Sequence, residues 1–454
     1  MALSGTRLLD LGLGAALAFA AGATALAVAT PGPAPDDSAL RVAFRRPDGL
    51  PEAPQDNPAS PAKEELGRRL FFDPALSASG TTACASCHQP ARGFSDGRPL
   101  ARGADGRPLR RRTPTLWNLA WAPFLFWDGR AEGLEAQAEA PIEAHEEMGQ
   151  PLDALVERLG RDASWRRDFG AAFPDDPAPV SRRNLTRAIA AWERTLVSPR
   201  TRFDAWVEGD DGALTASERR GLDLFTGRGG CAACHSGWAF TDYAFYDIGL
   251  PSRPGAAPDL GRGPVIGIAR ADRAFKTPTL RETLRGGDAP YMHDGSVPTL
   301  AAVVDHYAAG VEERPTLAPE LPRRLDLSPA DRADLLAFLA TLTSSPDAPL
   351  PRAATPPPAT PPSAGPPQRL ARVSQRGRQF APGRVSLTRG GVLEIANDDT
   401  TIHNIRVDAP ELRLNSGVQD PGQTVRWRLD RPGRFVAFCG IHPRMRLEIE
   451  VAAP

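Results

Sequence analysis

The sequence contains little lysine, histidine or cysteine, and these shortages limit its functions. Lys63 and Lys276 are the only lysines among 54 basic residues, and 55 acidic residues bring the net charge to −1. No basic face is indicated, which argues against a nucleic-acid partner. After residue 29 no stretch is apolar enough to cross a membrane. The composition, 41% hydrophobic and 24% charged, is that of a folded protein of about three domains.

The first 29 residues have the pattern of an export signal. Arg7 supplies an early positive charge, a small-residue apolar run begins at Leu11, and Ala27-Val28-Ala29 resembles a cleavage site. The run approaches membrane-spanning length, so an uncleaved anchor is the alternative. In either case the working part is expected in the periplasm.

Four of the five cysteines lie in two Cys-x-x-Cys-His runs. This pattern is typical of covalent haem c attachment, with two thioethers and a proximal iron ligand. A single zinc site is the alternative, but the pairs are far apart and each has its own trailing histidine. The expected attachment residues and iron ligands are Cys84, Cys87 and His88, then Cys231, Cys234 and His235.

The surroundings of the two runs are also duplicated. The paired segments are 67–71 with 221–225, 113–116 with 277–280, and 128–129 with 294–295. The repeat predicts two mainly helical haem c domains, residues 62–200 and 201–343, behind an extension at 30–61 that is not a core element. Helices are expected over 134–148, 152–169 and 184–197, and capping boxes begin helices at Thr215 and Ser328.

The last part of the chain has a different pattern. Residues 344–368 contain ten prolines and predict a semi-rigid linker. Residues 369–454 alternate apolar and polar side chains, with turns at Gly390-Gly391, Pro421-Gly422 and Pro432-Gly433. A small all-β sandwich is therefore expected after the two haem domains.

The fifth cysteine lies in this sandwich. Cys439, His442 and Met445 share one loop, and His403 lies earlier. One thiolate, two imidazoles and a thioether are the ligands of a type 1 copper site; the alternative is a core cysteine with incidental neighbours. The domain resembles cupredoxins of the plastocyanin and amicyanin type, with these residues at the four ligand positions. The resemblance also implies that Asn404 ties the two ligand loops together.

Residues 66–342 resemble the di-haem cytochrome c peroxidase family, which includes the methylamine utilisation protein MauG. Both haem motifs carry the resemblance, together with the segments 126–130, 137–148 and 291–295. It implies that the first haem reacts with peroxide and that the second stores or passes electrons. Trp127 matches the tryptophan between the haems, Glu147 the distal acid, and Gln137 and Pro141 other pocket positions.

Two of these site residues, Glu147 and Trp127, have a plainer interpretation. Glu147 lies in an acidic stretch with Glu143 and Glu146 and could be a surface carboxylate. Trp127 could be an ordinary core aromatic. For the catalytic role, a carboxylate at this position would move a proton between the two oxygens of the peroxide.

Only three histidines remain for other roles. Many relatives cap the first haem with a histidine from the following loop, but residues 89–112 contain none, so this haem is expected to be open unless His145 or another residue caps it. At the second haem, Tyr307 stands where peroxidases of the family have methionine, as in MauG, and His306 is the rival ligand. The family's calcium site partly uses an asparagine, and Arg112 occupies that position, so calcium stays open.

Three functions follow from these motifs. The first is a periplasmic peroxidase that reduces hydrogen peroxide with electrons passed through its own copper domain from an external redox protein or small donor. The second is a MauG-like enzyme that oxidises an organic or protein substrate. The third is a non-catalytic electron carrier. A dimer is compatible with all three.

Overall fold

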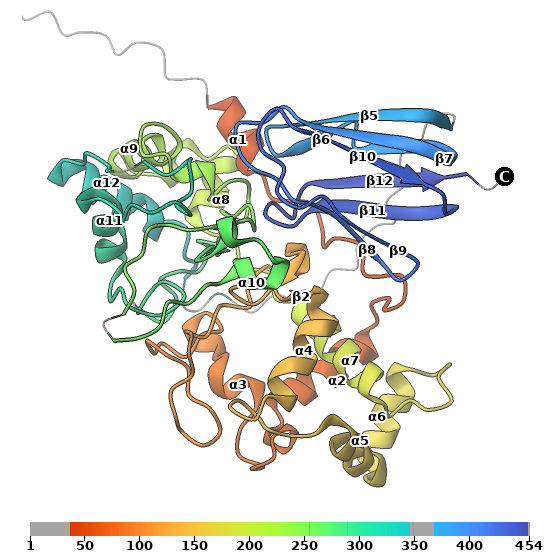
Figure 1. Ribbon diagram of the computed structural model, residues 1–454. Helices are drawn as coiled ribbons and strands as arrows, with labels where there is room; N and C mark the ends of the chain where they lie inside the picture. Colours follow the sequence, from red (N-terminus) through yellow and green to blue (C-terminus); the bar gives the residue numbers. More distant parts are fainter. Residues whose placement is uncertain are drawn as a thin grey trace, which may run out of the picture. The chain divides into compact units, whose positions relative to one another are not determined.

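The computed structural model describes residues 37–253, 255–287, 289–322, 324–345, 348 and 367–452 (Figure 1). Residues 39–454 form one compact unit. The predicted export signal and most of the proline-rich linker lie outside the described residues. Among the described residues, no helix is both long enough and apolar enough to span a bilayer.

The first haem unit is built on α2 (Pro61–Phe72) and α7 (Arg182–Arg194). Ser60 caps α2 by accepting a hydrogen bond from the Lys63 backbone, and Pro61 at the first helical position fixes the start. The two helices approach closely at Gly67, where an added Cβ would lie 1.8 Å from the Ala188 carbonyl oxygen. Only glycine allows this contact, which brings the haem-side residues of α2 next to α7.

The other elements of this unit are short. The helix expected over 152–169 is two helices, because Asp162 ends α5 and caps α6. The elements are η1 (Pro74–Leu76), α3 (Cys84–Cys87), η2 (Pro90–Arg92), η3 (Leu119–Trp121), β1 (Phe124–Leu125), β2 (Ala131–Glu132), α4 (Gly133–Glu143), α5 (Leu152–Arg161) and α6 (Ala163–Ala172).

The second haem unit repeats this packing. The capping boxes at Thr215 and Ser328 are confirmed, and they begin α9 (Ala216–Thr226) and α12 (Pro329–Ala340). Gly221 lets α9 and α12 approach closely, as Gly67 does for α2 and α7. A Cβ added to Gly221 would lie 2.1 Å from the Asp334 carbonyl oxygen. The remaining elements are α8 (Arg202–Val207), η4 (Asp211–Ala213), η5 (Cys231–Ala233), β3 (Phe245–Tyr246), α10 (Arg262–Ile266), η6 (Ala269–Ala271), β4 (Phe275–Lys276) and α11 (Leu300–Ala309).

Part of the predicted extension belongs to a core. Helix α1 (Ser38–Phe44) ends in Phe44, whose ring stacks on Phe240 at 4.8 Å and meets the edge of Phe203 at 5.7 Å. Phe44 is buried in the second haem unit, which differs from the expectation that residues 30–61 lie outside the core. A single aromatic in a proline-rich segment gives no periodic pattern that would have predicted this burial.

The C-terminal domain is the expected all-β fold, drawn in blue in Figure 1. Its strands are hydrogen bonded in the order β6-β5-β7-β12-β11-β8-β9, and β10 pairs with β7. Their bounds are β5 (Gln368–Arg376), β6 (Gln379–Ala381), β7 (Arg384–Asn397), β8 (Ile405–Ala409), β9 (Leu412–Asn415), β10 (Thr424–Leu429), β11 (Gly433–Cys439) and β12 (Arg446–Val451).

The turn expected at Gly390-Gly391 is wrong, because β7 continues through both glycines. Gly390 has φ +76°, so the strand changes direction there without ending. Residues 384–387 pair with β12, whereas residues 391–396 pair with β10. One bent strand therefore takes part in both halves of the sandwich.

Candidate haem and copper sites

The two Cys-x-x-Cys-His runs have the same local geometry. His88 follows α3, and its Nδ1 lies 3.0 Å from the Phe94 carbonyl oxygen; His235 follows η5, and its Nδ1 lies 3.0 Å from that of Phe240. An Nδ1–H that donates to a carbonyl leaves Nε2 free as a ligand. Burial lowers the pKa of both imidazoles, which favours the neutral form that binds iron. Both segments thus fit haem c.

A cavity of about 400 Å³ lies beside the second run. Its lining includes Cys231, Cys234 and His235 from the attachment run and Tyr307 from α11. The cavity also reaches Trp127 and other residues of the first unit. Its lining therefore contains both the residues that would attach a haem and residues from the neighbouring haem unit.

Tyr307 and His306 are adjacent but have different surroundings. Tyr307 lines the cavity, and burial raises its pKa. The His306 Nε2 lies 2.9 Å from the Ile248 carbonyl oxygen, which occupies one of its two ring nitrogens, and His306 is not among the residues that line the cavity. Of the other spare histidines, His293 stacks on Phe275 at 3.5 Å in the cavity, and His145 is exposed.

Glu147 lies near the first attachment run. Burial is the main cause that raises the pKa of the Cys84 and Cys87 thiols, and the negative charge of the Glu147 carboxylate raises both slightly further. Burial raises the pKa of Glu147 itself, while Arg130 lowers it. Its neighbour Glu146 is exposed. Glu147 is therefore half-buried and close to the place where the first haem would be attached.

Gln137 and Pro141 lie on α4, the helix that precedes Glu147. Gln137 is half-buried, and Pro141 lies inside the helix. The Met148 backbone N–H donates to the Pro141 carbonyl at 3.1 Å, which folds the chain back after the helix ends. This fold places the Glu147 segment against the end of α4.

Trp127 connects the two haem units. Its indole N–H donates to the Arg112 carbonyl at 2.8 Å, and its own carbonyl accepts from the Lys276 backbone at 2.8 Å. Burial lowers the pKa of Lys276 to about 8, and the Arg112 Nε has no partner. All three residues line the cavity. Arg112 occupies the position of an asparagine in the family's calcium site, and its side chain places a positive charge at the cavity. Calcium stays a prediction.

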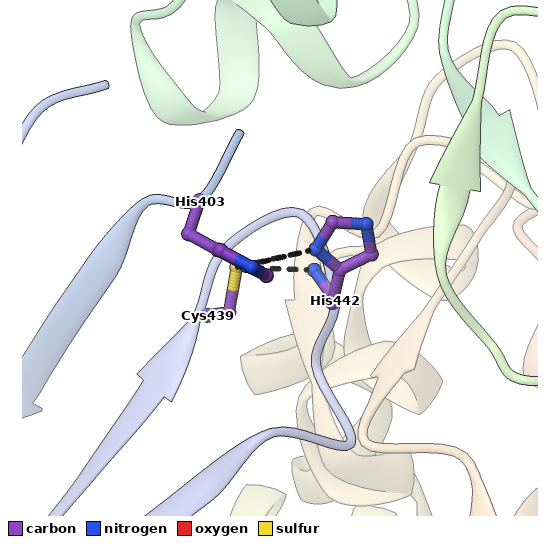
Figure 2. Close-up of side chains that lie close together, drawn as sticks. All are labelled: His403, Cys439 and His442. Carbon is purple, nitrogen blue, oxygen red and sulfur yellow. Dashed lines mark hydrogen bonds between the residues drawn. The ribbon is translucent and has the colours of Figure 1, made fainter. Parts of the chain in front are cut away.

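Three of the four predicted copper ligands, His403, Cys439 and His442, come together in the C-terminal domain (Figure 2). The Cys439 Sγ lies 3.5 Å from the His403 Nδ1 and 3.7 Å from the His442 Nδ1, and the two Nδ1 atoms are 3.2 Å apart. Met445 is buried in the same core and is tied to the site by backbone hydrogen bonds with Cys439 and His442. Thiolate and imidazole ligands at this spacing form a copper-like site.

Neighbouring groups hold these ligands in place. The Asn404 backbone N–H donates to the Cys439 Sγ at 3.5 Å, and the Gly440 N–H donates to the Asn404 carbonyl at 2.7 Å. Backbone atoms of Asn404 thus tie the two ligand loops, while its side chain binds Asn415 and Gly417. The His403 Nε2 lies 3.3 Å from Asp399, a partner that the sequence did not reveal.

The copper-ligand loop also contacts the haem units. The Arg262 guanidinium donates to the Gly440 carbonyl, and the Phe245 N–H donates to the Ile441 carbonyl. Arg378 of the C-terminal domain donates to the Ala233 carbonyl, inside the second haem attachment run. No sequence motif indicated these residues, because each contact joins segments more than 100 positions apart.

Comparisons with known proteins agree with the haem part of the site. The family model for di-haem cytochrome c peroxidases matches residues 61–212. The methylamine utilization protein MauG of Methylorubrum extorquens is 48% identical over 313 residues, which is 68% of this chain and 86% of that protein. The cytochrome c551 peroxidase of Pseudomonas aeruginosa is 34% identical over 293 residues, 63% of this chain and 80% of that one.

A solved structure of a related protein also matches this chain. A MauG-like protein associated with microbial copper homeostasis has a TM-score of 0.60 and 34% identity, over 66% of this chain and 95% of that chain.

Proposed function

The chain belongs to the di-haem cytochrome c peroxidase family that includes MauG, and from this premise we propose that it reduces hydrogen peroxide to water in the periplasm. Electrons would come through its cupredoxin-like domain from an external redox protein or small donor. The family is one of oxidoreductases, so a non-catalytic electron carrier is set aside.

The position of Glu147 is the single observation that carries the peroxidase proposal. It is an acid beside Cys84 and Cys87, and its pKa is raised by burial. Breaking the peroxide bond needs a base for the proton on the inner oxygen and an acid for the outer oxygen. A carboxylate with a raised pKa can do both in turn. His145, the nearby histidine, is exposed to solvent, so it is a poorer candidate for carrying this proton than the half-buried Glu147.

The remaining residues would hold the centres and exclude water. His88 and His235 would bind the two irons, Tyr307 would be the second ligand of the second haem, and Trp127 would pack between the haems. Bound haem iron supplies the redox chemistry. Reduction of peroxide takes two electrons and two protons and gives two waters, so a one-electron copper centre must be reduced twice in each turnover.

The copper-like site suits a donor role. His403, Cys439 and His442 are buried, and their positions are fixed by backbone hydrogen bonds and by Asp399. A rigid thiolate and imidazole site changes its geometry little between Cu(II) and Cu(I), which favours electron transfer over binding of a substrate.

A MauG-like oxidation of an organic or protein substrate is the second candidate. Two observations favour it: Tyr307 faces the second haem cavity, and identity to MauG is 48% against 34% to a cytochrome c551 peroxidase. A phenolate ligand stabilises ferric and more oxidised iron. In that case copper would exchange electrons with the haems without supporting peroxide turnover.

The test is peroxide turnover by protein loaded with both haems and copper. With reduced cupredoxin or cytochrome as the external donor, we expect steady consumption of peroxide. One equivalent of peroxide added to the Cu(I), diferric protein should oxidise copper and raise the blue absorption. The Cys439→Ser variant should react with the first equivalent but lose most donor-dependent turnover. If copper stays reduced while peroxide is consumed, the MauG-like function replaces the peroxidase.

A further inference from the structure

One copper ligand is covered by the second haem unit. The His442 imidazole is 3% exposed, and its ring centroid lies 6.2 Å from that of Tyr246 on β3. Tyr246 also lines the cavity that contains Cys234 and His235. One aromatic side chain therefore contacts a copper ligand on one side and the second haem cavity on the other.

Hydrogen bonds fix the copper-ligand loop in this position. Arg262 is 2% exposed, and its Nε donates to the Gly440 carbonyl at 2.9 Å. Its Nη1 donates to the carbonyls of Asp128 at 3.1 Å and Gly129 at 2.6 Å in the first haem unit. The Phe245 N–H donates to the Ile441 carbonyl at 3.2 Å. Buried hydrogen bonds from a guanidinium are strong, so the loop is held as part of the core.

Arg378 makes a second connection at the same place. Its Nη1 donates to the Ala233 carbonyl at 2.8 Å, its Nη2 pairs with Glu320 at 2.5 Å, and its guanidinium lies 5.3 Å from the Tyr246 ring centroid. The Arg378 backbone N–H donates to Asp399, which also contacts His403. Through its side chain and its backbone N–H, Arg378 therefore joins the haem attachment run, the Tyr246 ring and the Asp399 support of a copper ligand.

Tyr246 is itself immobilised. Its hydroxyl donates to the Asp242 carboxylate at 2.6 Å, and the Asp242 backbone N–H donates to the Cys234 carbonyl at 2.9 Å. Its ring is 7% exposed. A buried ring fixed at its hydroxyl end keeps a constant distance to both sites, which a mobile surface tyrosine would not.

We propose that Tyr246 is the bridge through which the copper site exchanges electrons with the second haem, with Arg262 and Arg378 as positioning residues that lock the copper domain against it. This inference rests on the proposed function for the direction of net electron flow. The transfer moves one electron and breaks no bond. The copper domain would then act as a fixed part of the enzyme, and its linker would serve as a connection and not as a swinging tether.

The test measures electron transfer without peroxide. In protein loaded with both haems and Cu(II), a flash photoreductant produces one ferrous haem, whose electron then passes to copper and bleaches its blue band. We expect Tyr246→Leu to lose the fast phase of this bleaching and Tyr246→Phe to keep it, because the ring remains. The copper and haem spectra of the resting variants should equal those of the wild type, which shows that both centres are intact.

Phe124→Leu is the matched control. Phe124 packs against Phe438 beside Cys439 at a ring distance of 5.5 Å and lies 4.8 Å from the Arg262 guanidinium, but it does not line the haem cavity, so it reports on packing around Arg262 without loss of the Tyr246 ring. It should keep the fast phase. Three results would each overturn the bridge. They are a fast phase of wild-type rate in Tyr246→Leu, an equal loss of the fast phase in Phe124→Leu, and the absence of a fast phase in the wild type. If the wild type transfers the electron rapidly but does not reduce peroxide, the proposed function is wrong and the bridge is not affected.

The lock is tested separately by hydrogen exchange. Arg262→Ala removes the hydrogen bonds to Gly440, Asp128 and Gly129, and exchange of the amides at 440–442 should become about 10- to 100-fold faster, as expected for loss of a charge-assisted bond. The half-buried Arg273 supplies the control variant, Arg273→Ala, because its side chain donates to Ser252 and, among the described residues, makes no hydrogen bond to the copper-ligand loop. Unchanged exchange in Arg262→Ala would show that the domain is not held by this residue.

Discussion

Replacing Glu147 with glutamine is the most direct test of the chemistry at the first haem. The Glu147 backbone N–H donates to Ala144 and its carbonyl accepts from Ala104 at 2.9 Å, and the substitution leaves both bonds intact. Glutamine has the same shape but cannot carry a proton between oxygens. The haem and copper content should therefore be unchanged, while the reaction with peroxide slows.

The expected magnitude follows from the role of a positioned proton carrier. Such groups contribute about 10²- to 10⁴-fold, which corresponds to about 2.7 to 5.4 kcal/mol of activation free energy. Glu147 is half-buried and its pKa is raised by burial, so its carboxylate is less hydrated and more basic than that of a surface glutamate. The rate of the wild type should also fall as the pH drops through this raised pKa, because the base becomes protonated. The variant should lose this pH dependence.

The assay is stopped-flow mixing of ferric protein with peroxide, followed at the haem absorption bands over a range of pH. Glu146→Gln is the control, because Glu146 is the adjacent glutamate in the same segment but is exposed. It should react like the wild type. If Glu147→Gln reacts as fast as Glu146→Gln at every pH, Glu147 is not the proton carrier, and the plainer interpretation of a surface carboxylate is correct.

Three further predictions concern the haem units. Because residues 89–112 contain no histidine, electron paramagnetic resonance of the isolated ferric protein should show a high-spin haem; two low-spin haems alone would contradict this. Tyr307→Met should raise the potential of the second haem in a redox titration, since methionine favours ferrous iron and phenolate does not; an unchanged potential would exclude Tyr307 as ligand. Glu193 is 4% exposed and burial raises its pKa to about 8, so its protonated form stabilises the folded state and this stability is lost as the pH rises from about 4.5 to about 8. In denaturant unfolding, the wild type should lose about 5 kcal/mol more unfolding free energy than Glu193→Gln over this pH range.

The cofactor motifs could be identified from the sequence because their ligands are close along the chain. The two Cys-x-x-Cys-His runs and the Cys439, His442 and Met445 loop each fit within a few residues, so spacing alone indicated the chemistry. The capping boxes at Thr215 and Ser328 were equally local and are confirmed. The all-β C-terminal domain followed from alternation of apolar residues, which needs no knowledge of distant contacts.

Local patterns failed where a distant partner decided the conformation. Two adjacent glycines normally indicate a turn, but at Gly390 strand β7 continues because β12 and β10 pair with it on the two sides of the bend. Phe44 follows a segment with no periodicity and is buried only because Phe203 and Phe240 leave room for its ring.

The relation between the copper site and the haems was decided by the tertiary structure alone. A linker rich in proline is equally consistent with a mobile tethered donor and with a fixed one. The hydrogen bonds from Arg262 to Gly440 and from Arg378 to Ala233 join residues 178 and 145 positions apart. A long side chain can satisfy a carbonyl on any segment that the fold brings within reach, and its own sequence neighbours carry no sign of which one. The sequence therefore determined which redox centres this protein can hold, and the packing of Tyr246 against His442 determined how they can be connected.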